Sequence, residues 1–262
     1  MSNGIQIRKK QIVIIITALV VLLATGLTCA IVFWPREKKL TTQEWLDAFS
    51  ESLDYATMTK DEDGNALETY IAREIEIKEI EDVVVKFKQT LQIAIAEDGQ
   101  AAAYLAIEEN YPTLEESKDD LMDEYYLCQG KMYTRREKGG KVQSSSFDSN
   151  LDILLTVASE NLGNAQYNFE EDNFLPVENG KGIIAHDGNT HQINAMISQD
   201  KYNKFFGKDA NIDGMSEVKI QMQMTDRRFD WLQIQYKQGD LSSMIKITRY
   251  DIQPVATPEW AR

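Results

Sequence analysis

The feature that most restricts the fold of this chain is a series of segments in which apolar and polar residues alternate. Residues 85–95 are the clearest case, because their apolar side chains fall on one side of an extended chain. Their polar positions are Lys86, Lys88, Thr90 and Gln92. A period of two predicts a β-strand with one buried and one solvated face. A turn signal at 97–99 leads into a second strand at 102–107, so the two segments predict a hairpin.

The same alternation recurs further along the chain. Residues 125–128 and 132–134 flank a Gln-Gly pair and predict a second hairpin. Residues 182–186 and 191–197 flank a four-residue turn and predict a third. Three more alternating segments predict a meander near the C-terminus, at 218–224, 232–236 and 245–247. Pairing between neighbours in sequence predicts an antiparallel sheet with one apolar face.

Three other segments have the apolar spacing of helices. Thr41, Thr42 and Glu44 resemble a capping box and predict a helix over residues 42–56. Similar spacing predicts a second helix at 151–162 and a short third one at 201–206. Residues 70–80 give conflicting signals, since some apolar positions have helical spacing and others alternate. The fold class is therefore α+β, with two or three helices packed on an antiparallel sheet.

An uncharged stretch near the N-terminus constrains the location of the chain. Residues 12–34 contain no charged side chain, and a helix of that length crosses a hydrocarbon core of roughly 30 Å. This predicts a short tail at 1–11, a transmembrane helix at 12–34 and one α+β domain at 35–262. Because the tail carries no domain, we expect an uncleaved signal anchor with the large domain outside the cytoplasm, at the cell membrane.

Two alternatives to a permanent anchor stay open. Thr28 and Ala30 form a weak cleavage site for a secretory signal, and Cys29 is a candidate for lipid attachment. All three interpretations place the domain on the far side of the membrane. The positive charges do not decide the orientation, because three basic residues flank the stretch on each side. These are Arg8, Lys9 and Lys10 before it, and Arg36, Lys38 and Lys39 after it.

The predicted domain is strongly acidic. Of the 28 Lys and Arg residues three precede residue 36, which leaves 25 basic against 42 acidic side chains and a net charge of −17. Such a surface repels nucleic acid, so we expect no nucleic-acid partner. Cys128 is the only cysteine after Cys29, so the domain has no intrachain disulfide. We interpret Cys128 as a small buried apolar residue.

Two groups of residues suggest metal ions without completing a site. His186 and His191 face each other across the third predicted hairpin, but zinc needs further ligands that the sequence does not specify. The first half of a calcium loop is matched by Asp209, Asn211, Asp213 and Gly214. The twelfth position of that loop should be Glu and is Ile220, while Glu217 fits only the ninth. We interpret both groups as turns and expect no metal and no cofactor.

The sequence offers little to support catalysis. It has no G-x-S-x-G or H-E-x-x-H motif and no phosphate-binding glycine loop. Carboxylate pairs such as Glu115 and Glu116 lie in a charge run, where solvation is expected. A triad can assemble in space without a linear motif. On these grounds we expect that the protein is not an enzyme.

The order of these features resembles the LolA/LppX-like group of lipoprotein carriers, which have a half-barrel fold. The strand pair at 126–133 resembles that group's Tyr-rich pair with a Gly turn. The segment at 216–260 resembles its ending, in which alternating strands run into Ile252, Gln253 and Pro254. The pattern covers most of residues 42–260. The chain departs from the bacterial lipoproteins of the group because Cys29 has Gly26 three residues before it, where they have an apolar residue.

The resemblance implies a curved antiparallel sheet around an apolar hollow that helices close. Its function is then to hold or hand over an apolar or lipid-like ligand. Eight side chains are expected to face the hollow, namely Phe87, Leu91, Ile93, Leu105, Met222, Met224, Ile234 and Tyr236. The competing interpretation is that the same side chains pack against the helices as an ordinary core.

A second function belongs to a different class. The domain is then a tethered interaction or sensory module of the cell envelope, without a small-molecule ligand, that binds protein through an edge strand or an acidic loop. A sheet of the NTF2 or cystatin type also begins with a helix and fits this interpretation. The expected partners are the membrane, an apolar ligand and envelope proteins.

Overall fold

The structure is a computed structural model that describes residues 40–79, 83–95, 99–111, 120–162, 167–177, 182–207 and 212–262. Residues 41–262 form a compact unit of their own. The predicted tail at 1–11 and the predicted transmembrane stretch at 12–34 lie outside the described residues. Among the helices that are described, none combines the length and the apolar character that crossing a bilayer requires.

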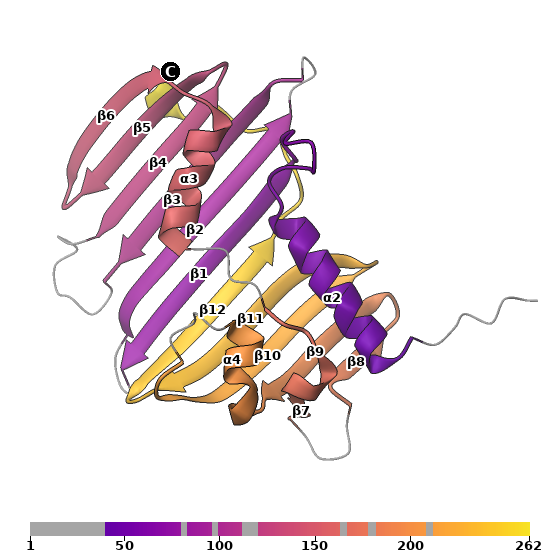
Figure 1. Ribbon diagram of the computed structural model, residues 1–262. Helices are drawn as coiled ribbons and strands as arrows, with labels where there is room; N and C mark the ends of the chain where they lie inside the picture. The colour runs from indigo at the N-terminus through magenta and orange to yellow at the C-terminus, as the bar shows by residue number, and fades with distance from the viewer. Residues whose placement is uncertain are drawn as a thin grey trace, which may run out of the picture. The chain divides into compact units, whose positions relative to one another are not determined.

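Twelve strands in the described part of the chain form one antiparallel sheet (Figure 1). Their order is β6-β5-β4-β3-β2-β1-β12-β11-β10-β9-β7, and β8 pairs with β9. The first six are β1 (Thr69–Glu79), β2 (Val83–Ile95), β3 (Ala101–Asn110), β4 (Leu121–Cys128), β5 (Lys131–Lys138) and β6 (Lys141–Asp148). The others are β7 (Phe174–Pro176), β8 (Ile184–Asp187), β9 (Thr190–Ile197), β10 (Met215–Thr225), β11 (Arg228–Gln238) and β12 (Leu241–Arg249). The order does not return to its start, so the sheet is open.

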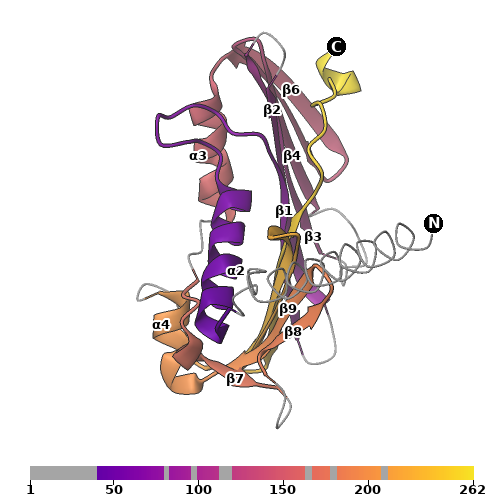
Figure 2. The ribbon, with the colours of Figure 1, turned by 90° about the vertical axis from the view of Figure 1, so that its right-hand side faces the viewer.

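The helices gather on one face of this sheet. They are α2 (Thr42–Thr57), α3 (Leu151–Leu162) and α4 (Tyr202–Phe206), with the single turns η2 (Glu171–Asn173) and η3 (Gln199–Lys201). The single turn η4 (Glu259–Ala261) belongs to the C-terminal segment on the other face. Figure 2 shows the sheet nearly edge-on, with α2, α3 and α4 on one side and the strands near β7 bending toward them. We call the face that carries Ile71, Leu91, Leu105 and Ile247 and lies under α2 and α3 the concave face, and the other the outer face.

The alternating segments have become strands because one set of their side chains is covered by helices. Ile71 pairs with Leu91, and Leu91 pairs with Leu105, so one apolar row crosses β1, β2 and β3. Leu46 and Phe49 of α2 are fully buried against the same core. Removal of these apolar side chains from water is the main contribution to the stability of such a domain.

The first predicted helix is confirmed together with its capping box. The Thr41 hydroxyl accepts a hydrogen bond from the Glu44 N–H at 3.2 Å, and the Glu44 carboxylate accepts one from the Thr41 N–H at 2.8 Å. Two N–H groups at the start of the helix are thereby satisfied. The second predicted helix is confirmed as α3, and the three predicted hairpins and the meander are all present.

Three expectations need correction or completion. The conflict over residues 70–80 is resolved as strand β1, because both of its edges find antiparallel partners, in β2 and β12. Strand β6 was not expected, since its Ser-rich sequence does not alternate; it forms as the partner of β5 across the turn at Gly139 and Gly140. Cys128 is a free thiol that is only partly buried, because it lies near the end of β4 next to a turn.

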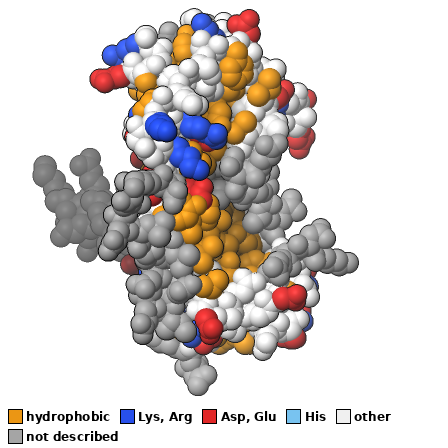
Figure 3. All heavy atoms as spheres, turned by 90° about the vertical axis from the view of Figure 1, so that its left-hand side faces the viewer, with side chains coloured by type: hydrophobic (Ala, Val, Ile, Leu, Met, Phe, Trp, Pro, Cys, Tyr) orange, Lys and Arg blue, Asp and Glu red, His pale blue; other side chains and the backbone are white. Residues whose placement is uncertain are grey.

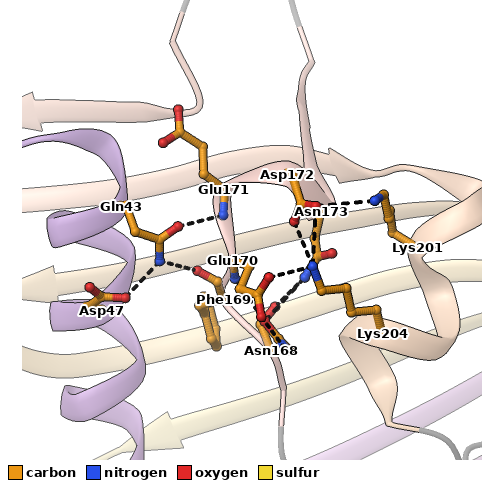
Figure 4. Close-up of polar contacts among 10 residues, drawn as sticks. All are labelled: Gln43, Asp47, Asn168, Phe169, Glu170, Glu171, Asp172, Asn173, Lys201 and Lys204. Atoms are coloured by element: carbon orange, nitrogen blue, oxygen red, sulfur yellow. Dashed lines mark hydrogen bonds and ion pairs between the residues drawn. The ribbon is translucent and has the colours of Figure 1, made fainter.

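A polar network joins α2 to α4 (Figure 4). The Gln43 side chain of α2 donates to the Phe169 carbonyl at 3.1 Å and accepts from the Glu171 N–H at 2.8 Å. Lys204 of α4 forms ion pairs with Glu170 and with Asp172. The segment between α3 and β7 thus links α2 to α4.

The C-terminal segment crosses the outer face. The Gln92 amide donates to the Gln253 carbonyl at 2.7 Å, and the Trp260 indole N–H donates to Glu124 at 3.2 Å. Glu124 is buried and is also held by Tyr104 and Arg135, each at 2.6 Å. Burial, followed by the hydrogen bond to Glu124, raises the pKa of Tyr104. The outer face is therefore polar but partly covered.

Candidate functional site

The eight side chains expected to face a hollow all lie on the concave face. Six of them are buried in the core beneath the helices: Leu91, Ile93, Leu105, Met222, Met224 and Ile234. Phe87 and Tyr236 are partly exposed. The close packing of the six accounts for their apolar character. Contact of any of the eight with a ligand stays a prediction.

An open cavity lies at the edge of the concave face where α2 ends. Its volume is about 490 Å³, which falls within the range of small-molecule sites. It is lined by Tyr55, Ala56, Ala66, Leu67, Glu68, Thr69, Tyr70, Ile95, Arg249 and Ile252. The lining comes from residues 55–70 at the end of α2 and the start of β1, from the end of β2, and from residues 249–252 at the end of β12, so three segments distant in sequence converge here.

Exposed apolar side chains cluster around this cavity. Tyr55 is 74% exposed, Ile95 40% and Ile252 36%, and all three line it. Met58 and Tyr250 are also exposed; the Met58 carbonyl accepts a hydrogen bond from Thr69, and the Tyr250 ring lies 4.9 Å from that of Tyr70. Large exposed apolar side chains that line a cavity are typical of a binding surface.

The rim of the cavity is held by local hydrogen bonds. The Thr69 hydroxyl donates to the Met58 carbonyl at 2.7 Å, and the Tyr250 N–H donates to the Tyr70 carbonyl at 2.9 Å. In the loop between α2 and β1, Asp61 accepts from the side chain and N–H of Asn65, and these bonds lower the pKa of Asp61. The cavity is therefore built from ordered turns.

Two charged side chains line the cavity. Arg249 is partly buried and follows Ile245 and Ile247 on the concave side of β12. Glu68 is exposed, and its carboxylate accepts from the Ile95 N–H at 3.3 Å. A mostly apolar wall with few polar groups is the usual composition of a ligand site.

A second cavity, of about 250 Å³, lies at the far end of β1 and has a different character. Four of its five charged side chains form ion pairs, Lys78 with Glu76 at 2.7 Å and Lys237 with Glu217 at 2.8 Å. The fifth, Lys219, has no ion pair with a described residue. Hydrogen bonds from Lys78 and Lys86 lower the pKa of Glu76. We interpret this cavity as a solvated ion-pair surface.

Apolar side chains are also accessible on the concave face near the end of β1 and the start of β2. Ile75, Ile77, Val85 and Phe87 occupy adjacent positions of β1 and β2 and are only partly buried. Figure 3 shows apolar side chains gathered in the middle of one side of the molecule, below a group of Lys and Arg side chains. The helical layer therefore leaves part of the concave face uncovered.

The two histidines meet as expected. His186 pairs with His191 across β8 and β9, with 3.0 Å between their Nδ1 atoms, and both rings pack on Trp45. Burial, and then the nearby His186 and Arg227, lower the pKa of His191. Among the described residues, no group of three or more His, Cys, Asp or Glu side chains is arranged to hold a metal ion. Asp209 and Asn211 of the half calcium loop lie outside the described residues.

One motif has the spacing of a catalytic pair without its geometry. Ser243 and Lys246 have the S-x-x-K spacing of some hydrolases. Both lie on β12, where positions three apart point to opposite faces of the sheet. This spacing on a strand therefore does not bring the two side chains together.

Sequence reasoning missed the residues that line the larger cavity. Arg249 has one local signal, since it continues the concave-face series of Ile245 and Ile247 with a charged side chain. Tyr55 and Ile252 have none, because their meeting depends on how α2 and the C-terminal segment end beside β1.

Comparisons with known proteins yield no family. No family model matches the chain, and neither does any curated protein. The chain has a similarity to the crystal structure of a beta-barrel-like protein of domain of unknown function DUF1849 from Brucella abortus. The sequences are 10% identical, and the match covers 72% of this chain and 100% of that one at a TM-score of 0.18. A likeness at this level does not establish a shared fold.

Proposed function

We propose that this protein is a membrane-anchored, extracytoplasmic domain that binds an apolar or lipid-like ligand on the concave face of a half-barrel sheet. The observation that carries the proposal is the cavity of about 490 Å³ at the edge of that face, surrounded by exposed apolar side chains. An acyl chain that enters it gains about 0.8 kcal/mol for each CH₂ group removed from water. The order of elements that resembles the LolA/LppX-like carriers supports the same function.

The uncharged stretch at 12–34 supports the membrane anchor, and the net charge of −17 on the remainder supports a domain in solvent. Protease added to intact cells tests this placement. We expect cleavage within residues 41–262 before lysis. If these residues are cleaved only after lysis, the domain lies in the cytoplasm and the anchor is oriented the other way.

Native mass spectrometry of residues 41–262, the compact unit, tests ligand binding. We expect the purified protein to carry an extractable apolar molecule that a Tyr55→Ser, Ile252→Ser double variant lacks. The matched control is Val142→Ser on β6, an exposed apolar side chain on the edge strand of the sheet, outside the cavity. A wild-type protein that is empty and does not take up added long-chain lipids contradicts the proposal.

A second function, a protein-interaction or sensory module, has one observation in its favour. Every residue of β6 is exposed, and among the described strands β6 has a partner on one side only, β5. An open edge of this kind accepts an added strand from a partner. Cross-linking from position 144 of β6 in intact cells tests it, and a discrete protein adduct there, with an empty cavity, favours this function.

A further inference from the structure

The two cavities differ in how their charges are compensated. In the polar cavity, the ammonium groups of Lys78 and Lys237 each lie within 2.8 Å of a carboxylate oxygen, and only Lys219 has no ion pair among the described residues. In the apolar cavity, Arg249 forms no ion pair with any described residue. Arg249 is therefore a cation that lines a mostly apolar cavity without a counter-ion among the described residues.

The position of Arg249 is set by the strand that carries it. Its pairing with Ile71 places it on the concave side, next to an apolar row that also contains Leu91. Ile71 and Leu91 are both buried, and Arg249 itself is partly buried. A cation in apolar surroundings is stabilised when an anion or a hydrogen-bond acceptor reaches it.

The other charged group of the cavity does not serve as that anion. The Glu68 carboxylate accepts from the backbone N–H of Ile95 at 3.3 Å and makes no ion pair with Arg249. The planar guanidinium presents several N–H donors in a fork that matches two oxygens of a carboxylate or a phosphate. Exposed apolar side chains stand beside it, with Tyr55, Ile95 and Ile252 lining the same cavity.

We propose, on the basis of the function proposed above, that the ligand is an amphiphile with an anionic headgroup, which Arg249 binds while the apolar chain lies against Tyr55, Ile95 and Ile252. A carboxylate, as in a fatty acid, and a phosphate monoester, as in a lipid headgroup, share the required chemistry. Arg249 is then the residue that determines headgroup specificity, and the apolar wall determines affinity for the chain.

Photolabelling of the full chain in nanodiscs tests this inference. Three probes carry the same diazirine-bearing alkyl chain and end in a carboxylate, a phosphate or a neutral alcohol. Labelled peptides that cover residues 55–70 and 249–252 are quantified by mass spectrometry. We expect at least one anionic probe to half-saturate labelling at about one tenth of the concentration that the alcohol requires, as for one charge-assisted pair. The preferred anion identifies the headgroup.

The variant Arg249→Gln should remove this preference while labelling by the alcohol stays unchanged. Glu68→Gln removes the opposite charge from the same cavity and should leave or strengthen the preference. Lys141→Gln removes a positive charge from β6 and should have no effect. Thermal unfolding checks that each variant is folded.

The outcomes separate the two proposals. If all three probes label wild type equally, or if the preference for an anion survives in Arg249→Gln, the headgroup inference is wrong and the proposed function stands. If no probe labels these peptides more strongly than it labels peptides elsewhere in the protein, both the headgroup inference and the proposed function are wrong. Labelling that follows the charge of residue 249 supports both.

Discussion

Strands β10 and β6 belong to the same sheet but differ completely in their cover. In β10, the side chains of Val218, Ile220, Met222 and Met224 are fully buried, whereas all eight residues of β6 are exposed. Helix α2 packs on β1, β10 and β11, and α3 packs on β2, β3 and β4. Figure 1 shows β6 beyond the reach of both helices. Burial of a strand therefore depends on a helix supplied from elsewhere in the chain.

The largest effect is expected in the covered half. Phe49 of α2 is fully buried over this half of the sheet, so Phe49→Ala should lower the free energy of unfolding by about 3–5 kcal/mol. Val142 of β6 is 52% exposed, and Val142→Ala should change it by less than about 0.5 kcal/mol. Urea unfolding of residues 41–262 measures both. If the two variants lose similar amounts of unfolding free energy, the covered and the exposed strands do not differ in their contribution to stability.

The stability of the covered half should also depend on pH. Tyr167 is buried in the helical layer beside Phe205, and burial raises its pKa to about 12, although Arg73 acts in the opposite direction. The unfolded chain releases this proton near pH 10 and the folded chain only near pH 12, so stability is complete below pH 10 and falls between these values. The loss is roughly 2–3 kcal/mol.

Replacement of the phenol isolates its contribution. Tyr167→Phe cannot ionise, so its free energy of unfolding should fall less than that of wild type between pH 10 and pH 12. Denaturant unfolding at several pH values in that window provides the measurement. Parallel curves for the two proteins would show that Tyr167 is accessible to solvent and that the cover is looser than its packing indicates.

The hydrogen bonds that connect parts of the helical layer should have a smaller effect on the free energy of unfolding. Gln43 makes two hydrogen bonds to the backbone of the segment that links α2 to α4, so Gln43→Ala should cost about 1–2 kcal/mol. Gln192 donates to Gln223 at 2.7 Å on the outer face, where it is exposed. Gln192→Ala should cost less than about 0.5 kcal/mol, because water replaces its partner. Equal costs in thermal unfolding would mean that the layer does not depend on this connection.

Much of the fold follows from local pattern, because most strands pair with their neighbours in sequence. The hairpin of β2 and β3 and the boundaries of α2 and α3 could be predicted from alternation, turn residues and the capping box at Thr41. Strand β1 was ambiguous, since its apolar spacing fits two periods and only pairing with β12, far along the chain, decides between them. Strand β6 has no alternation to reveal it.

The candidate site was less predictable for a related reason. Alternation identifies the side chains that share a face, so all eight predicted ligand residues lie on the concave face. It does not reveal which of them a helix covers, and six of the eight lie in the packed core. The cavity forms where that cover stops, at the end of α2, and its residues Tyr55 and Ile252 meet only in three dimensions.

The smallest effect on stability is expected at the cavity itself. Tyr55 is 74% exposed, so Tyr55→Ser should change the free energy of unfolding by less than about 0.5 kcal/mol. It should nevertheless weaken binding of a long-chain amphiphile by about fivefold or more, since the ring lines the cavity in which we propose that the chain binds. Ile153 of α3 is 48% exposed and lies outside the cavity, so Ile153→Ser should change neither quantity. If Tyr55→Ser destabilises the fold as much as a core substitution, then α2 covers the sheet to its last turn, and the edge of the concave face is part of the core instead of a place where a ligand enters.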